Sequence, residues 1–81
     1  MHFVYILTCL KGEYFYKGLT DNLERRLQQH IDGKVSSTKN KLPIELIHVE
    51  ICSDRVYGRQ MEKFFKSGYG REIIEEIIDD T

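Results

Sequence analysis

The chain contains no tryptophan, a single proline and only two cysteines among its 81 residues. Cys9 and Cys52 lie 43 positions apart without any paired spacing, which argues against a disulfide scaffold and predicts reduced thiols in the cytoplasm. No apolar run approaches the roughly 20 residues of a membrane-spanning helix, and Met1 to Tyr5 lack the basic region and cleavage site of a signal peptide. A glycine-rich phosphate loop and a Gly-x-Ser-x-Gly turn are also absent. We therefore expect a cytoplasmic protein without a membrane segment.

The charge of the chain is small overall but unevenly distributed. With 41% hydrophobic and 31% charged residues, the 81 residues have the size and composition of one globular domain. The net charge of −1 by itself argues against a general nucleic-acid binder, which tends to be basic. Residues 1–70 nevertheless carry +3, and residues 71–81 carry −4. We expect one domain over residues 1–81, with an acidic C-terminal helix over about residues 70–80.

Two aromatic and β-branched segments near the start of the chain predict a β-hairpin. Phe3 to Cys9 and Tyr14 to Leu19 are rich in residues that favour strands, and Lys11-Gly12 supplies a turn between them. Both faces of the first segment are mostly apolar. We therefore expect a strand that is covered on two sides.

A third strand is predicted over Ile44 to Cys52, where Ile47, Val49 and Ile51 alternate and should share one face. The stretch before it, residues 34–43, is polar and basic and ends in the only proline. A loop of this length inside a small domain is more often functional than incidental.

The first helix is expected to begin at Asp21. The Asp21 carboxylate can accept hydrogen bonds from the amides of the first turn, and Glu24 completes a capping-box pattern three residues later. Apolar residues that recur every four positions define the predicted buried face: Leu23, Leu27 and Ile31. Gly33 is expected to end this helix.

Two further helices are predicted in the C-terminal part. Ser53 or Asp54 caps the first of them. Its apolar stripe consists of Tyr57, Met61, Phe64 and Phe65. Gly68 and Gly70 interrupt the helical pattern, and residues 71–80 repeat it with four isoleucines. The predicted fold class is α+β, a three-stranded antiparallel sheet with packed helices in the order ββαβαα.

One constellation of side chains could carry chemistry: Tyr5, Tyr16, Arg26, His30 and Glu62. The two tyrosines lie on the strands of the hairpin, so strand pairing could bring them together. On the first helix, Arg26 falls about 100° and His30 about 60° from the centre of the apolar stripe, which places both at the border of the core. Each residue also has a purely structural interpretation, such as a core tyrosine, a surface helix charge or a solvated glutamate.

Several separated blocks of the chain carry a family pattern. They are Phe3-Val4-Tyr5, Tyr16-Lys17-Gly18, Thr20 to His30, Gly33-Lys34, Ser37-Thr38-Lys39, Arg59 to Lys63 and Phe65 to Glu72. The spacing Asn-Leu-x-x-Arg-x-x-x-His after Tyr-x-Gly is the most specific part. In these blocks the sequence resembles the GIY-YIG nuclease superfamily, and nearly the whole chain is similar to its small stand-alone bacterial members.

The resemblance implies an endonuclease that hydrolyses phosphodiester bonds in DNA or another nucleic acid with one divalent metal ion, Mg²⁺ or Mn²⁺. By position, Glu62 would be the metal ligand and Arg26 would hold the scissile phosphate. Tyr5, Tyr16 and His30 would line the reaction path, and which of them takes the proton of the attacking water stays open. A single carboxylate suits Mg²⁺, which keeps most of its waters and takes other ligands from the substrate phosphate.

Four lysines are candidates for contacts with the nucleic-acid backbone: Lys17, Lys34, Lys39 and Lys41. Lys17 stands at the centre of the second motif, where the family usually has a hydrophobic residue. The other three lie in the basic stretch over residues 34–43 and could also be solvated loop charges. On a nuclease-like scaffold, we prefer contacts with phosphates.

Two other functions stay open at this point. The chain could be a nucleic-acid-binding module with weak or absent turnover, since no asparagine follows Glu62, where some members of the superfamily carry one. It could also be a protein-interaction domain whose acidic tail recruits a basic partner. The sequence indicates neither a homodimer nor a particular protein partner.

Overall fold

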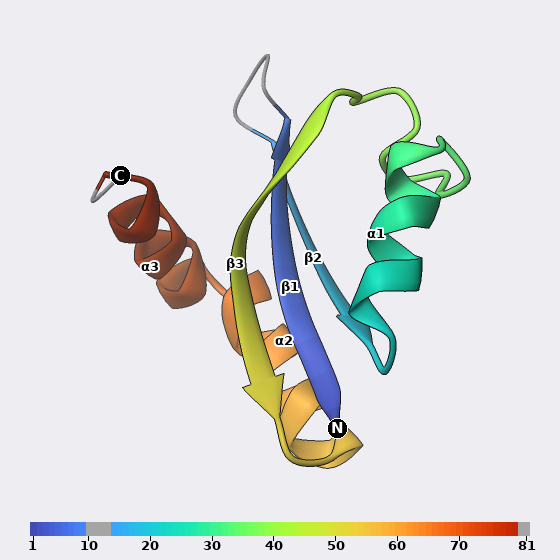
Figure 1. Ribbon diagram of the computed structural model, residues 1–81. Coiled ribbons are helices and arrows are strands. Elements are labelled where there is room, and N and C mark those ends of the chain that lie inside the picture. Colours follow the sequence, from blue (N-terminus) through green and yellow to red (C-terminus); the bar gives the residue numbers. More distant parts are fainter. Residues whose placement is uncertain (10–13, 80–81) are drawn as a thin grey trace.

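The computed structural model describes residues 1–9 and 14–79, which form one sheet and a set of helices around it (Figure 1). The strands are β1 (His2–Cys9), β2 (Phe15–Thr20) and β3 (Ile44–Cys52), and the helices are α1 (Leu23–Ile31), α2 (Arg55–Lys66) and α3 (Gly68–Asp79). β1 pairs antiparallel with both neighbours, which gives the strand order β2-β1-β3. The predicted fold class and element order are therefore confirmed. The predicted turn at Lys11-Gly12 and the predicted last helical residue, Asp80, lie outside the described residues.

The two faces of the sheet carry different helices: α1 lies on one side, and α2 and α3 lie on the other (Figure 1). The core on the α2–α3 side consists of Val4, Ile6, Cys52, Phe65 and Ile74. Tyr5 and Leu7 alternate with Val4 and Ile6 along β1, and they are buried on the α1 side. β1 is thus covered on both faces, as its sequence predicts. Among the described residues, no helix is long and apolar enough to cross a membrane.

A β-bulge in β3 changes which of its residues face the core. The pairing of β1 with β3 shifts between Ile6 and Leu7, which leaves Ile47 as an extra residue on β3. Ile47 packs against the α2–α3 core, whereas Val49 and Ile51 pair with the β1 residues of the α1 face. The prediction that these three residues share one face is therefore wrong, because the bulge interrupts the strand alternation.

Helix α1 begins one residue later than predicted. Asn22 is its N-cap, and the Asn22 Oδ1 accepts a hydrogen bond from the backbone N–H of Arg25 at 3.1 Å. The Thr20 hydroxyl accepts the N–H of Asn22 at 3.1 Å and fixes the turn into the helix. The predicted cap at Asp21 is wrong: its carboxylate instead forms an exposed ion pair with Arg25 at 3.8 Å.

The buried face of α1 is rotated relative to the predicted stripe. Ile31 is 59% exposed, whereas His30 is wholly buried. The prediction that His30 lies at the border of the core is wrong, because Tyr5 and Thr38 supply hydrogen-bond partners inside. Gly33 has a φ of 74° and follows the helix end, as predicted.

The junction between α2 and α3 lies at Ser67. Asp54 is the N-cap of α2, which decides between the two predicted caps. Helix α3 starts at Gly68, so both glycines lie in its first turn and not between the helices. Gly70 packs directly on the backbone of Phe64, where a Cβ atom would have no room. The missing side chain at Gly70 is therefore what allows α3 to turn closely against α2.

Candidate active site

A buried hydrogen-bonded chain connects β1, α1 and the loop over residues 34–43. The Oη of Tyr5 lies 2.9 Å from Nε2 of His30, and Nδ1 of His30 lies 2.7 Å from Oγ1 of Thr38. All three residues are wholly buried. Thr38 therefore fixes the loop to the helix. Thr38 lies in one of the family blocks but was not among the predicted site residues, because its burial depends on the tertiary contact with His30.

Arg26 joins this chain from the accessible side of α1. Its Nε donates to the Oη of Tyr5 at 3.4 Å, and its Nη1 donates to Oε1 of Gln29 at 3.0 Å. Because the Tyr5 oxygen accepts from Arg26, we assign the phenol proton to the hydrogen bond with Nε2 of His30. His30 then carries its own proton on Nδ1 and donates it to Thr38.

The electrostatics of the cluster follow from burial and from the Arg26 charge. Burial raises the pKa of Tyr5 to about 12, although the hydrogen bond from Arg26 acts in the opposite direction. Burial, and then the positive charge of Arg26, lower the pKa of His30. The hydrogen bond to Tyr5 raises the pKa of the Arg26 guanidinium. At neutral pH the cluster therefore combines a protonated phenol, a neutral imidazole and a cation.

Acidification is expected to destabilise the folded protein through His30. The pKa of His30 is lowered in the folded state, whereas an unfolded chain has a histidine pKa of about 6.5. Below that pH the unfolded state binds the proton more readily, so the stabilisation is complete above about pH 6.5 and is lost as the pH falls through the folded-state pKa. Urea unfolding between neutral and mildly acidic pH should show a steeper loss for wild type than for His30→Gln. Parallel pH profiles for the two proteins would contradict this prediction.

Tyr16 completes the cluster at its accessible edge. Its ring centroid lies 4.9 Å from that of His30 and 6.0 Å from that of Tyr5. Tyr16 is half-buried, whereas Tyr5 and His30 are wholly buried. Tyr16 is therefore the tyrosine of the cluster that a substrate can reach. Gly18, which pairs with Tyr5, leaves the space that the Tyr5 phenol fills.

A cleft of about 350 Å³ lies beside Arg26, at the end of the edge strand β2. Its lining comes from the start of β1, the end of β2, the turn that follows β2, helix α1 and the first residue of α2, and includes His2, Leu19, Thr20, Asp21, Arg25, Arg26, Gln29 and Arg55. Three arginines against one carboxylate favour the binding of a phosphate group. Arg55 was not among the predicted site residues, because only the packing of α2 against β2 brings it near Arg26.

Glu62 lies on α2, apart from the cluster. Gly58, one turn before Glu62, packs against Leu19 of β2. Because residues four apart lie on the same face of a helix, Glu62 lies on the side of α2 that faces β2. The Oε2 of Glu62 accepts a hydrogen bond from Nζ of Lys66 at 3.3 Å, and the Glu62 side chain is 24% exposed. Within the described residues, no hydrogen bond or ion pair joins Glu62 to the other predicted site residues. The structure brings together Tyr5, Tyr16, Arg26 and His30, and Glu62 lies across the edge strand from them.

Glu62 belongs to no cluster of three or more candidate metal ligands among the described residues. In the described ranges, no group of three or more His, Cys, Asp and Glu side chains is arranged to hold a metal ion. A zinc site, with four protein or solvent ligands dominated by nitrogen and sulfur, does not fit a lone carboxylate. Mg²⁺ or Mn²⁺ fits it, because such an ion keeps several waters and takes further oxygen ligands from a substrate phosphate.

The four predicted lysines fall on two sides of the sheet. Lys17 follows Tyr16 directly in β2, so its side chain lies on the α2–α3 face, opposite to the cluster. Lys34, Lys39 and Lys41 are exposed in the loop that Thr38 fixes to α1. The structure therefore places only the loop lysines on the same side as Arg26.

The fold, the tyrosine pair on β1 and β2, and the arginine and histidine on α1 define a GIY-YIG catalytic domain. Residues 1–74 match the family described under that name, and the chain belongs to it. The predicted membership in the GIY-YIG superfamily is thus confirmed.

The relatives of the chain are UPF0213 proteins, a small single-domain GIY-YIG family. The chain is 39% identical over 80 residues to a UPF0213 protein of Bacillus licheniformis, with 98% of this chain and 80% of that protein covered. It is 37% identical over 80 residues to one of Natronomonas pharaonis, with 98% and 92% covered. The solution NMR structure of a UPF0213 protein from Bacillus halodurans is similar with a TM-score of 0.57 and 28% identity, covering 94% of this chain and 83% of that one.

Proposed function

We propose that the protein is an endonuclease that hydrolyses phosphodiester bonds of a nucleic acid, in the first place DNA, with one Mg²⁺ or Mn²⁺ ion. One observation carries the proposal: Arg26 lines an arginine-rich cleft, and both Arg26 and the half-buried Tyr16 are backed by the buried chain Tyr5–His30–Thr38. A permanently charged guanidinium beside an accessible phenol suits a reaction in which negative charge grows on a phosphoryl group. Membership in the GIY-YIG family supports the same class of reaction.

Each residue of the cluster has a distinct part in this proposal. Arg26 binds the non-bridging oxygens of the scissile phosphate, because it lines the cleft while its Nε is held by Tyr5. Tyr16 orients the attacking water, since Tyr5 and His30 are closed to solvent. Tyr5 and His30 hold Arg26 and Tyr16 in place and can share a proton along their hydrogen bond.

Glu62 is the residue of this proposal that would hold the metal ion. A divalent ion at Glu62 would neutralise charge on the leaving oxygen. A nucleic-acid strand that crosses the edge strand β2 could contact Arg26 on one face and Glu62 on the other, because both side chains flank β2. Substrate binding thus completes a site whose protein groups lie apart in the free protein.

The proposal is tested with labelled single-stranded, duplex and branched DNA in Mg²⁺ or Mn²⁺. Wild type should cut at least one of these substrates, and Arg26→Ala should cut it roughly 10²- to 10³-fold more slowly, because one preorganised charge at the phosphate is lost. Arg59→Ala is the matched control, since Arg59 is exposed on α2 and does not line the cleft. Equal cleavage by Arg26→Ala and wild type would show that another site, or a contaminant, is responsible.

A second candidate function is a nucleic-acid-binding module on the same scaffold with little or no turnover. The ion pair of Glu62 with Lys66 favours this second function, because the Lys66 ammonium already pairs with the carboxylate that is proposed to bind the metal ion. This alternative predicts salt-sensitive binding of DNA by wild type without strand cleavage in either metal ion. The cleavage assay on the same DNA distinguishes the two functions directly.

A further inference from the structure

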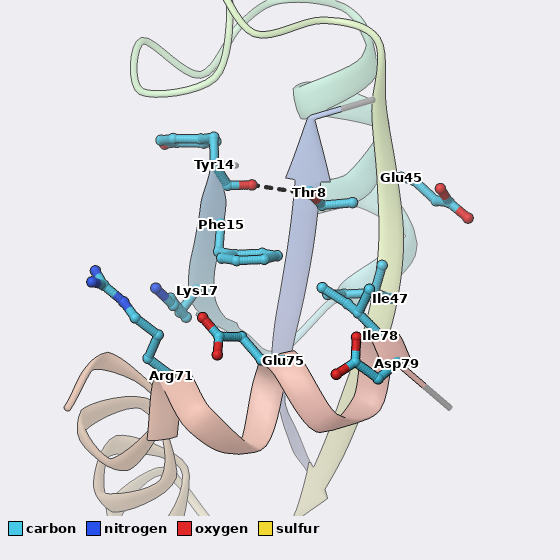
Figure 2. A pocket seen from close by; sticks show the side chains of 10 residues that line it. All are labelled: Thr8, Tyr14, Phe15, Lys17, Glu45, Ile47, Arg71, Glu75, Ile78 and Asp79. Carbon is cyan, nitrogen blue, oxygen red and sulfur yellow. Dashed lines mark hydrogen bonds between the residues drawn. The ribbon is translucent and has the colours of Figure 1, made fainter. Parts of the chain in front are cut away.

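A second cavity, of about 820 Å³, lies on the α2–α3 face of the sheet, opposite to the cluster around Arg26 (Figure 2). Figure 2 shows the three strands along one wall and α3 along the other, with Phe15 of β2 and Ile47 of β3 between them. None of the residues that line this cavity belongs to the Tyr5–Tyr16–Arg26–His30 cluster.

The two ends of the cavity carry opposite charge. Lys17 of β2 and Arg71 from the first turns of α3 lie at the end near β2, whereas Glu45 of β3 and Asp79 lie at the end near β3 (Figure 2). Glu75 lies one turn after Arg71, on the same side of the cavity as Lys17 (Figure 2). An anion that approaches from the side of β2 therefore meets positive charge first, and the acidic end restricts it to that side.

Two cations near β2, Lys17 and Arg71, have no ion-pair partner among the described residues. No ion pair among the described residues involves Lys17 or Arg71, and the Lys66 ammonium pairs with Glu62. The Lys17 Nζ lies 5.9 Å from the ring centroid of Phe15, which supports the ammonium over the floor of the cavity. Burial lowers the pKa of Lys17, and the charges of Arg71 and Lys66 lower it further. A bound anion would relieve the repulsion between Lys17 and Arg71.

The end of the cavity that carries Lys17 and Arg71 lies on the opposite face of the sheet from the Tyr5–Tyr16–Arg26–His30 cluster. Lys17 follows Tyr16 in β2, and successive residues of a strand point to opposite faces. Glu62 lies on α2 one turn before Lys66 and pairs with it. The charge of Lys66 in turn acts on Lys17. Tyr16, Glu62 and Lys17 therefore surround the same stretch of the edge strand.

We propose that Lys17 and Arg71 form a phosphate subsite for a nucleic-acid strand that crosses the edge strand β2. This inference rests on the proposed function and extends it to the far face of the sheet. The strand would place one phosphate near Arg26 and a neighbouring part of its backbone against Lys17 and Arg71. In the absence of such a subsite, Lys17 would only protect an exposed sheet edge from pairing with other chains, and the following experiment separates the two roles.

The test is the binding of a fluorescein-labelled single-stranded oligonucleotide by the full chain in EDTA, measured by anisotropy over a series of salt concentrations. Lys17→Gln/Arg71→Gln should bind roughly tenfold or more weakly at low salt, and the slope of log K against log salt should become shallower by about 1.4 for two lost phosphate contacts. Arg59→Gln/Lys63→Gln is the matched control, because it removes one arginine and one lysine from exposed positions of α2 that do not line the cavity. The control should change the slope little.

A second pair of variants tests whether DNA binding becomes tighter, while Lys17 and Arg71 are both kept. Glu75→Gln removes a carboxylate from the cavity and should tighten binding, whereas Glu76→Gln, exposed on α3 outside the cavity, should not. If wild type binds and the variants in each pair behave alike, the subsite is wrong and the proposed function stands. If wild type does not bind the single-stranded oligonucleotide even at low salt, the subsite is wrong, and the cleavage assay decides separately on the proposed function.

Discussion

Replacing Glu62 by glutamine is expected to lower metal-dependent cleavage roughly a thousandfold while DNA binding in EDTA is kept. Glutamine preserves the size of the side chain but removes the charge that would hold a divalent ion. The loss of about 4 kcal/mol of charge stabilisation in the transition state corresponds to a factor of this order. The measurement is the initial cleavage rate over a range of Mn²⁺ concentrations, together with a Mn²⁺ titration in the presence of DNA.

The matched control for this change is Glu76→Gln on α3, which removes the same charge from an exposed position outside both cavities. Glu62→Gln also breaks the ion pair with Lys66, but an exposed pair of this kind contributes only about 0–1 kcal/mol to folding. Unfolding curves should therefore nearly coincide for the two variants and wild type. A Glu62→Gln variant that cleaves within a fewfold of wild type would exclude Glu62 as the metal ligand.

Gly18→Ala is expected to destabilise the protein by about 1–3 kcal/mol and to abolish most of its cleavage activity. A Cβ atom at Gly18 would overlap the phenol ring of Tyr5, a wholly buried side chain that cannot move aside freely. The ring would have to shift away from His30 and Arg26, which breaks the hydrogen bonds that position the guanidinium. Urea unfolding gives the change in stability, and the cleavage assay on folded protein gives the change in rate.

Gly68→Ala controls for the general effect of adding a methyl group to a glycine. A Cβ atom at Gly68 meets nothing within 4 Å, and the residue lies in the first turn of α3. Alanine there should leave stability unchanged or slightly improved, because it reduces the freedom of the unfolded chain. If Gly18→Ala proves as harmless as Gly68→Ala, then Tyr5 does not depend on the space at Gly18 and its proposed positioning role is wrong.

The element order was accessible from the sequence because it follows from patterns over a few neighbouring residues. Strand-forming runs alternate with apolar residues at helical spacing, and an Asp or Asn stands before each of the first two helices. The predicted start of α1 was wrong because two local signals competed there. At the start of α1, both Asp21 and Asn22 can cap, and the hydrogen bond from the N–H of Asn22 to Thr20 decides in favour of Asn22.

The wrong face of β3 and the wrong burial of His30 have a different origin. The bulge at Ile47 depends on how β3 pairs with β1, so the residues of β3 do not predict it by themselves. His30 is buried because Tyr5, 25 positions earlier, and Thr38, eight positions later, satisfy its two nitrogens. Neither partner belongs to the helical pattern from which His30 was predicted to lie at the border of the core.

The small number of cysteines and prolines and the absence of long apolar runs, together with the motif residues, determined the class of fold and the types of side chain available for chemistry. The sequence also determined that Tyr16 and Lys17 point to opposite faces, because adjacent strand residues always do. Only the tertiary structure decided that Tyr5 and His30 are closed to solvent, that Arg55 joins Arg26 at one cleft, and that Arg71 of the acidic helix lies beside Lys17. The physical reason is that burial and charge pairing depend on contacts between residues far apart in the chain, whereas local patterns record only neighbours along it.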